Sequence, residues 1–144
     1  ANFIVPTGFD EDPDLPARPS NSIRLFTMRS DGQFNTTIYS LDDRFRGVWG
    51  TRMVLLMCAD DMQRLGLAEG DIVTATTPAS DGVPRSVGGL RVVTFDVPAG
   101  CVAGYYPECN PLIPLWHHAI DSKVPAVKAI DIVLQRTGAA ALAA

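Results

Sequence analysis

A short polar stretch, "TMRSDGQFNTTIY" at residues 27–39, carries the side chains of this sequence that are best suited to holding a ligand. The hydrogen-bonding residues within it are Arg29, Ser30, Gln33, Asn35, Thr36 and Thr37. A buried polar ligand needs a partner for each of its polar groups, because an unpaired buried group costs about 1–3 kcal/mol. Gly32 would let the backbone approach such a ligand closely. The alternative is a network of turns in which these side chains bond to one another and to the backbone.

The rest of the sequence offers no residue pattern for catalysis by this chain alone. We find no nucleophile with a general base, no cluster of metal ligands and no phosphate-binding P-loop. His117 and His118 are adjacent, and adjacent side chains on a strand point to opposite faces, so a shared metal ion is not expected. The three cysteines, Cys58, Cys101 and Cys109, form no Cys-x-x-Cys pair. This argues against a disulfide framework or an iron–sulfur cluster, and it favours a cytoplasmic protein.

The charge of the chain is unevenly distributed. The formal net charge of the 144 residues is −4, but the stretch 10–14 holds four acidic residues and no basic one. In the remainder of the chain, acidic and basic residues are equal in number, which argues against a nucleic-acid partner that would require a broad basic face. No apolar run approaches the ~20 residues needed to cross a bilayer, so no membrane partner is expected. Arginines outnumber lysines among the basic residues, and a few of them could still build a local anion site.

The elements that would position the polar stretch are mainly strands. Segments 23–28 and 127–134 alternate between apolar and polar residues, 71–77 and 90–97 are rich in β-branched residues, and 53–58 is a continuous apolar run. Residues 59–67 predict a short helix, with Asp60 and Asp61 in its first turn, Met62 and Leu65 toward the core, and Gly66 as its C-terminal cap. Residues 77–89 read as a loop. The length and the hydrophobic content of 47% suit one domain, so we expect a small, closed, mainly β barrel with one or two short helices.

Both ends of the chain differ from this body. Residues 1–20 are rich in proline and acidic residues, which predicts an extended linker. Residues 137–144 predict a flexible C-terminal tail. The barrel domain is therefore expected to span residues 21–136. The segment "LDDRFRG" at 41–47 is typical of a surface or interdomain salt-bridge region, and its Arg44 and Arg46 could dock another domain.

Four segments of the body resemble one protein family. They are "RSDGQFNTTIYSLDDRFRG" (29–47), "DMQRLGLAEGDIV" (61–73), "GCVAGYYPECNPLIPL" (100–115) and "SKVPAVKAIDIVL" (122–134). Together they are similar to the C-terminal domain of molybdopterin-dependent oxidoreductases, and in particular to the formate dehydrogenase-like alpha subunits. The resemblance covers residues 22–135, and the first segment is its most specific part.

This resemblance implies a fold, a cofactor and partners. The fold is a double-psi β-barrel, which aspartate decarboxylases share. The cofactor is molybdopterin guanine dinucleotide, whose molybdenum or tungsten would be held mainly by the rest of the parent protein. The partners are the remaining domains of that oxidoreductase. The isolated domain is not expected to be catalytic, and neither Cys101 nor Cys109 is expected to bind the metal.

The resemblance also implies which residues lie near the cofactor. Arg29 would pair with a phosphate or with the pterin. Ser30, Gln33, Asn35 and Thr36 would orient heterocycle edges or phosphate oxygens, and Gly32 would let the backbone approach. From "GYYPECN", residues 104–110, come Tyr106, Glu108 and Asn110, whereas the alternative there is a tight turn with Tyr105 in the core. Ser122 and Lys128 complete the expected set. Lys128 would begin an inward row of apolar residues and place its ammonium group at the barrel mouth.

Two other functions compete with this interpretation. Aspartate decarboxylases of the same fold cleave a Gly–Ser bond to make their pyruvoyl group, and this chain contains no Gly–Ser dipeptide. A non-catalytic double-psi barrel adaptor that binds a protein or peptide remains the alternative. That reading predicts an exposed apolar groove.

Overall fold

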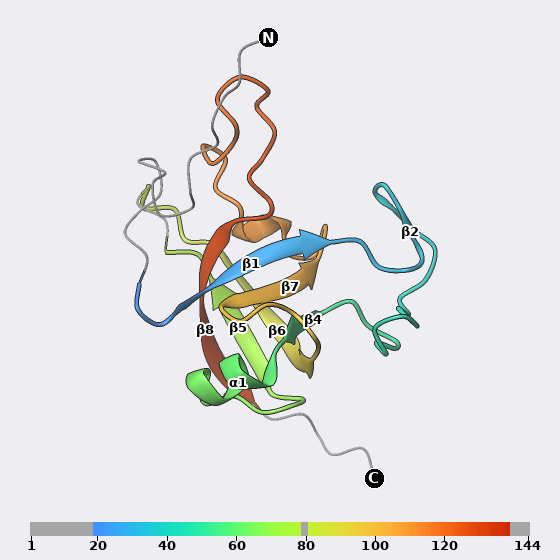
Figure 1. Cartoon of the computed structure of the whole chain (residues 1–144). Coiled ribbons are helices and arrows are strands. Elements are labelled where there is room, and N and C mark those ends of the chain that lie inside the picture. The colour runs from blue at the N-terminus through green and yellow to red at the C-terminus, as the bar shows by residue number, and fades with distance from the viewer. Residues whose placement is uncertain (1–18, 79–80, 139–144) are drawn as a thin grey trace.

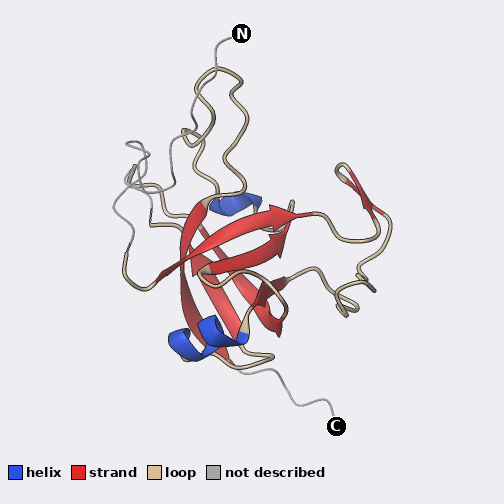
Figure 2. Cartoon of the chain, viewed as in Figure 1, coloured by secondary structure: helices blue, strands red, loops and turns tan. Residues whose placement is uncertain are grey.

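The strands of the chain close into a barrel in the order β1, β7, β4, β6, β5, β8 (Figures 1 and 2). The computed structural model describes residues 19–78 and 81–138. The barrel strands are β1 (Ser22–Met28), β4 (Val54–Met57), β5 (Ile72–Thr76), β6 (Ser86–Thr94), β7 (Cys101–Tyr105) and β8 (Ile130–Gly138). A hairpin of β2 (Gln33–Phe34) and β3 (Thr37–Ile38) lies between β1 and β4. The helices of the described residues are α1 (Ala59–Leu65) and the 3-10 helix η1 (Asn110–Leu112).

The strand pairings have an internal two-fold pattern. β1 runs parallel to β7, and β6 runs parallel to β4. β1 is antiparallel to β8, and β6 is antiparallel to β5. Exchanging the half β1–β4–α1–β5 for the half β6–β7–η1–β8 therefore leaves every barrel pairing unchanged. Two interlocked parallel pairs in a closed six-stranded barrel are the mark of a double-psi β-barrel, so the expected fold class is confirmed.

Three of the expected strands are confirmed close to their predicted positions. The segments 53–58 and 71–77 contain β4 and β5, and the segment 23–28 covers all of β1 except its first residue, Ser22. The segment 59–67 contains α1, whose first turn holds Asp60 and Asp61 and whose C-terminal cap is Gly66 with φ of 67°. Met62 is buried and Leu65 packs partly against the core, as the helical spacing predicts.

The remaining strands differ from expectation. β6 begins at Ser86 rather than at residue 90, so it includes part of the segment predicted to be a loop. β8 begins at Ile130 and ends at Gly138, so Lys128 precedes the strand rather than starting its inward row, and the strand extends into the segment predicted to be a tail. β7 was not predicted as a strand, because its sequence "CVAGY" contains small residues in place of a β-branched run. The predicted linker up to residue 18 and the tail from residue 139 lie outside the described residues.

The barrel interior is filled by aliphatic side chains, and those of neighbouring strands lie side by side. Ile23 and Leu25 from β1 meet Val102 from β7 and Ile132 from β8, and all four are fully buried. A second cluster, around Tyr105, packs on the side of the barrel that leads to the β1–β4 connection. Neither helix in residues 19–78 and 81–138 has the length and apolar content needed to cross a bilayer.

Gly104 is the position where β7 packs most tightly. A methyl group there would lie 2.5 Å from Sγ of Cys109 and 3.3 Å from side-chain carbons of Leu25 and Leu55. Cys109 is fully buried, and burial raises the pKa of its thiol to about 12.

The Gly104→Ala substitution should therefore destabilise the fold by about 1–3 kcal/mol, because the added methyl overpacks the core. Chemical denaturation measures this loss. Combining it with Cys109→Ala, which removes the clashing sulfur, should cost less than the sum of the two single substitutions. A Gly104→Ala variant as stable as the parent would contradict this packing.

Candidate functional site

The candidate site lies where two parallel strands end side by side. Met28 at the end of β1 is in register with Tyr105 at the end of β7, so Arg29 and Tyr106 leave the barrel together. The chain that enters β8 comes back to the same place, because the backbone amide of Thr27 donates to the carbonyl of Val127 at 2.9 Å. Three segments that are distant in sequence therefore meet at one mouth of the barrel.

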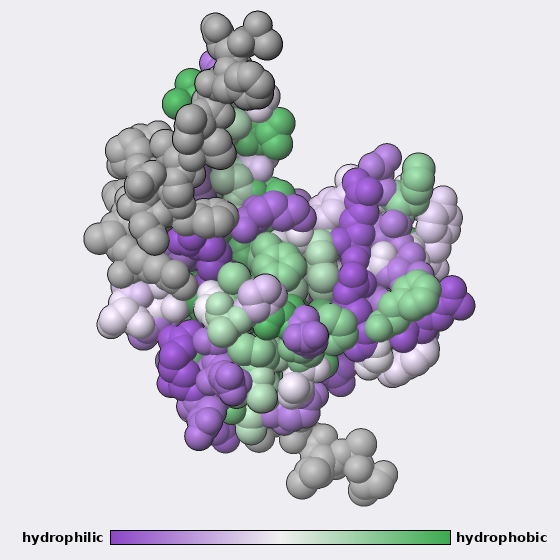
Figure 3. All heavy atoms as spheres, viewed as in Figure 1, coloured by the Kyte–Doolittle hydropathy of each residue, from purple (hydrophilic) through white to green (hydrophobic). Residues whose placement is uncertain are grey.

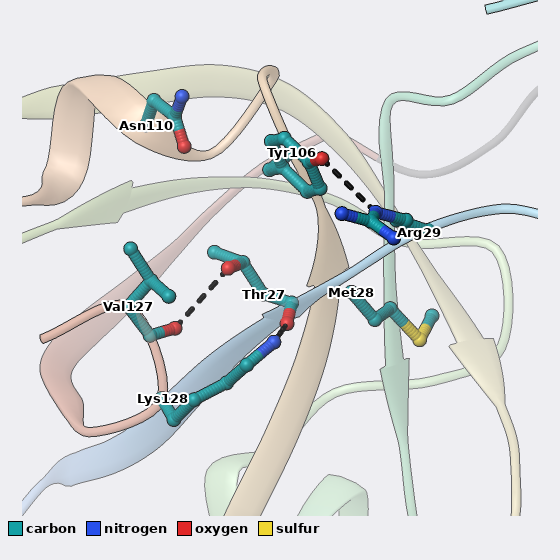
Figure 4. Close-up of a pocket in the computed structure, with 7 residues that line it drawn as sticks. All are labelled: Thr27, Met28, Arg29, Tyr106, Asn110, Val127 and Lys128. Carbon is teal, nitrogen blue, oxygen red and sulfur yellow. Dashed lines mark hydrogen bonds between the residues drawn. The ribbon is translucent and has the colours of Figure 1, made fainter. Parts of the chain in front are cut away.

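A pocket of about 600 Å³ opens at this mouth (Figure 4). Its volume is within the usual range of small-molecule sites. The lining residues are Thr27, Met28, Arg29, Tyr106, Asn110, Val127 and Lys128. Two of the seven are basic and none is acidic, so the pocket has the charge and the hydrogen-bond donors that suit an anionic ligand.

Arg29 is held above the pocket by two neighbours. Its Nε donates to the hydroxyl of Tyr106 at 3.1 Å, and its Nη2 donates to Oδ1 of Asn35 at 2.9 Å. The Tyr106 hydroxyl in turn donates to the backbone carbonyl of Asn35. Asn35 has a φ of 52°, a conformation that asparagine tolerates better than most residues, and it forms the turn of the β2–β3 hairpin. The guanidinium group is therefore oriented before any ligand arrives.

Lys128 approaches the pocket from the opposite side. Its ammonium group donates to the backbone carbonyl of Thr27, and the Thr27 hydroxyl donates to the carbonyl of Val127 at 3.2 Å (Figure 4). Asn110 stands at the start of η1 and is exposed. Side chains from three different connections therefore present two cations, a carboxamide and a phenol to the same space.

A neighbouring pocket of about 230 Å³ extends this space. It shares Asn110 and Val127 with the first pocket and adds His118 and Lys123 from the η1–β8 loop, residues 113–129. The ring of His117 is buried instead and lies 5.4 Å from that of Trp116. The two adjacent histidines therefore face different surroundings, and the described residues contain no group of three or more His, Cys, Asp or Glu side chains placed to hold a metal ion.

Arg52 organises the polar stretch beneath the pocket, and sequence reasoning missed it. It lies just before β4, its exposed fraction is only 3%, and its guanidinium group forms an ion pair with Glu108 at 2.6 Å. The same group donates to Oγ of Ser30, to Oε1 of Gln33 and to the carbonyl of Tyr106. Its carbon Cζ lies 4.8 Å from the centre of the Tyr105 ring.

Several predicted residues are partners of Arg52 rather than lining residues of the pocket. Ser30 and Gln33 are buried, and the amide of Gln33 also donates to the carbonyls of Asn35 and Tyr106 at 2.9 and 3.0 Å. Glu108 accepts from Nε and Nη2 of Arg52. For Ser30 and Gln33, the structure has the network that was the alternative interpretation of the polar stretch, and Glu108 joins this network from the turn after β7.

The other predicted residues lie outside the pocket. A methyl group added at Gly32 would lie 3.2 Å from Cβ of Ser40, so the close approach at this glycine is to another part of the same loop. Thr36 is exposed in the turn of the β2–β3 hairpin. Ser122 is exposed on the η1–β8 loop, where its hydroxyl accepts from the amide of Val124 at 3.4 Å.

Asp43 connects this network to the outer part of the β1–β4 connection. Its carboxylate accepts from the Tyr105 hydroxyl at 2.7 Å and forms an ion pair with Arg46. Burial would raise the pKa of Asp43, but its hydrogen bonds with Tyr105 and Arg46 outweigh burial and hold that pKa below its ordinary value. Burial and the neighbouring carboxylate raise the pKa of Tyr105, so its hydroxyl remains a donor. Tyr105 is fully buried, as the alternative interpretation of residues 104–110 predicted.

Comparison with known families identifies the chain. Residues 23–129 match the family described as "Molydopterin dinucleotide binding domain". The chain belongs to this family. The matched residues include the β1–β7 register at the pocket mouth and all seven residues that line the pocket, and the resemblance found in the sequence is confirmed at this level.

Curated relatives of this molybdopterin dinucleotide binding domain are much longer proteins. A protein of Mycobacterium tuberculosis, named as an uncharacterized oxidoreductase, is 43% identical over 123 residues, which cover 83% of this chain and 16% of that protein. Protein YdeP of Escherichia coli is 35% identical over 137 residues, covering 94% of this chain and 18% of that protein. A rationally designed protein, mkDPBB_sym_86, aligns with 19% identity and a TM-score of 0.43, covering 80% of this chain and 94% of the design.

The chemistry of the pocket fits the ligand of the family. A dinucleotide carries a pyrophosphate, for which Arg29 and Lys128 supply positive charge. It also carries flat heterocycles, for which the Tyr106 ring offers a stacking face and Asn110 offers both a donor and an acceptor. The donor set of this domain is therefore suited to a molybdopterin-type dinucleotide.

The Arg52→Ala substitution should destabilise the domain by roughly 3–5 kcal/mol, since it leaves the partners of a buried cation unpaired. Denaturant titration followed by circular dichroism measures the change. Arg44→Ala is the matched control: its side chain is 69% exposed and pairs with Asp31, so its loss should cost no more than about 1 kcal/mol. Equal effects of the two substitutions would contradict the organising role of Arg52.

The Asp43→Asn substitution tests the carboxylate at Tyr105. The pKa of Asp43 is lower in the folded state than its unfolded value of 3.8, so its stabilisation is present above that pH and is lost as the pH falls through the folded value. The variant should lose about 1–3 kcal/mol at neutral pH and show a shallower further loss than the parent as the pH falls below about 4. Urea unfolding across this pH range would test it, and parallel pH profiles for variant and parent would contradict it.

Proposed function

We propose that this chain is the C-terminal cofactor-binding domain of a larger, cytoplasmic molybdenum- or tungsten-dependent oxidoreductase. We further propose that the enzyme is formate dehydrogenase-like and that the dinucleotide carries guanine. The resemblance of residues 29–47 to formate dehydrogenase-like alpha subunits supports both refinements. The oxidoreductase name of the mycobacterial relative, and the 16% of that protein which the chain spans, support a larger parent enzyme.

One observation carries the proposal. Four of the residues chosen from the sequence, Arg29, Tyr106, Asn110 and Lys128, line a single pocket although they come from three separate segments. A network that served stability alone would have no need to gather two cations at an open mouth, where like charges repel. A bound pyrophosphate would neutralise both.

The residues divide into two roles in this proposal. Arg29 and Lys128 bind phosphate oxygens, and Tyr106 and Asn110 orient a heterocycle. Ser30, Gln33 and Glu108 act through Arg52, which fixes the loop that carries Arg29. The predicted contacts of Gly32, Asn35, Thr36 and Ser122 would require the ligand to extend beyond the pocket toward the hairpin and the η1–β8 loop.

The cofactor supplies the redox chemistry when it is bound, and this domain supplies binding and orientation. The residues here hold the dinucleotide, keep water from part of its surface and set its position relative to the other domains. Formate is the first substrate to test in the parent enzyme, because the resemblance points to it, although the fold by itself fixes no substrate.

The test is cofactor occupancy in the full-length enzyme. Arg29→Ala and Lys128→Ala should each weaken dinucleotide binding by about 10–100-fold, the equivalent of one charge-assisted hydrogen bond of about 1.5–3 kcal/mol. Arg64→Ala is the control: Arg64 lies on α1, pairs with Asp61 and is remote from the pocket lining. Metal and guanine nucleotide released per chain are the measurements, with circular dichroism to verify folding. Unchanged occupancy in both pocket variants would overturn the assignment.

A further inference from the structure

The connection from β1 to β4, residues 29–53, stands away from the barrel (Figure 1). We call it the β1–β4 loop. Apart from the short hairpin of β2 and β3, it contains no regular secondary structure. Loops of this length are uncommon in compact domains and are usually functional. The pocket residue Arg29 and its partner Asn35 form the inner part of the loop. We call the side chains of Phe34, Tyr39, Leu41, Phe45 and Trp49 its outer part, and none of them lines the pocket.

The outer part of the loop exposes large apolar side chains. Its exposed fractions are 71% for Phe34, 77% for Tyr39, 54% for Leu41, 71% for Phe45 and 60% for Trp49. Figure 3 shows separate apolar areas, in green, among hydrophilic ones on this protruding lobe at the right of the view. Single exposed apolar residues are ordinary on protein surfaces, but a gathering of this kind on one segment marks an interaction site.

The loop holds these side chains in a defined arrangement. Val48 is fully buried, and the backbone of Asp43 pairs with it in an isolated antiparallel bridge. Asp42 accepts from the amide of Gly50 at 2.7 Å, and Arg44 pairs with Asp31 at 2.9 Å. The rings are therefore presented on an ordered support, which lowers the entropy cost of binding.

The composition of this surface matches that of interface centres. Tryptophan, tyrosine, phenylalanine and arginine are enriched there. Arg44 stacks over the ring of Phe45 with Cζ 5.0 Å from its centre. The ion pairs of Arg44 and Arg46 lie within the loop, so the partner needs no opposite charge and would be mainly apolar.

We propose that the outer face of the β1–β4 loop, residues Phe34, Tyr39, Leu41, Phe45 and Trp49, docks against an apolar surface of another domain of the same polypeptide. This inference rests on the proposed function for the existence of those domains. The chain spans only 16–18% of the length of its relatives, so a longer polypeptide would contain other domains to which the loop could bind. The docked domain would lie beside the pocket, because the same loop carries Arg29, which lines the pocket, and its partner Asn35. Docking of the loop would close the pocket from the hairpin side.

Hydroxyl-radical footprinting of the purified full-length enzyme tests the docking. The oxidation rates of Phe45 and Trp49 are compared with those of the same residues in unfolded peptides. Docking predicts a roughly tenfold drop, since the exposed fraction would fall from 60% or more to the few per cent typical of an interface centre. Rates that match free exposure would overturn the proposal.

Two variants of the full-length enzyme test whether the exposed rings of the β1–β4 loop cause the protection from oxidation. Phe45→Ser combined with Trp49→Ser should restore fast oxidation of Tyr39 and Phe34. Val83→Ser is the matched control, because Val83 is also apolar and 51% exposed but lies in the β5–β6 connection. It should leave the footprint unchanged. Protection of Tyr39 and Phe34 that persists in the double variant would overturn the proposal.

The alternatives for the partner give different results. A second copy of the chain predicts protection that disappears on dilution together with a dimer in native mass spectrometry, and a separate adaptor partner predicts protection that disappears when a co-purifying protein is removed. Either result overturns docking within one polypeptide. Metal and guanine content are measured in the same preparation, so protection without cofactor would reject the proposed function alone, and cofactor without protection would reject only the docking.

Discussion

The buried guanidinium group of Arg52 is the contact on which the geometry of the pocket depends. It sits at the entrance to β4 and binds the start of the β1–β4 loop through Ser30 and Gln33. It also binds the turn after β7 through the carbonyl of Tyr106 and the carboxylate of Glu108. Removing one partner of a buried ion pair is costly, so these segments are fixed relative to each other. Arg29, which is exposed, and Tyr106, which is half-buried, belong to the same two segments and line the pocket.

The two-fold pattern of the barrel allows the residues at its two equivalent ends to be compared. The ends of β1 and β7 have a counterpart in the ends of β6 and β4, since exchanging the halves leaves the pairings unchanged. At the first end, Lys128 precedes β8 and binds a carbonyl of β1. At the second, Glu69 precedes β5 and accepts from the amide and hydroxyl of Thr94 at the end of β6. The residue that precedes the returning strand is therefore a cation at the first end, Lys128, and an anion at the second, Glu69.

The residue patterns of β1, β4 and β5 were sufficient to predict a mainly β barrel, and the family resemblance narrowed it to the double-psi fold. The residue patterns were insufficient for β7, where Gly104 and Ala103 are selected by close packing against the core, a constraint that strand propensity does not contain. The two-fold pattern was also invisible in the residues, since it lies in the pairings and not in a repeated motif.

The sequence indicated where the candidate site lies, but not which of its residues line the pocket and which are buried beneath it. A polar stretch rich in donors indicated Arg29, Ser30, Gln33 and Asn35 together. Only the structure separates Ser30 and Gln33, which are buried against Arg52, from Arg29, which lines the pocket. Arg52 gave no signal of its own, because a single arginine before an apolar run has no pattern, and its partners are 19–56 residues away in sequence.

The most direct measurement of the central claim is the cofactor content of the native protein. The polypeptide that contains this domain would be isolated from its source, its mass determined, and its molybdenum, tungsten, pterin and guanine nucleotide quantified per chain. We predict a polypeptide several times longer than this chain that carries metal and a pterin guanine dinucleotide. A free chain of 15.5 kDa with neither metal nor pterin would contradict the account and would favour an adaptor barrel instead.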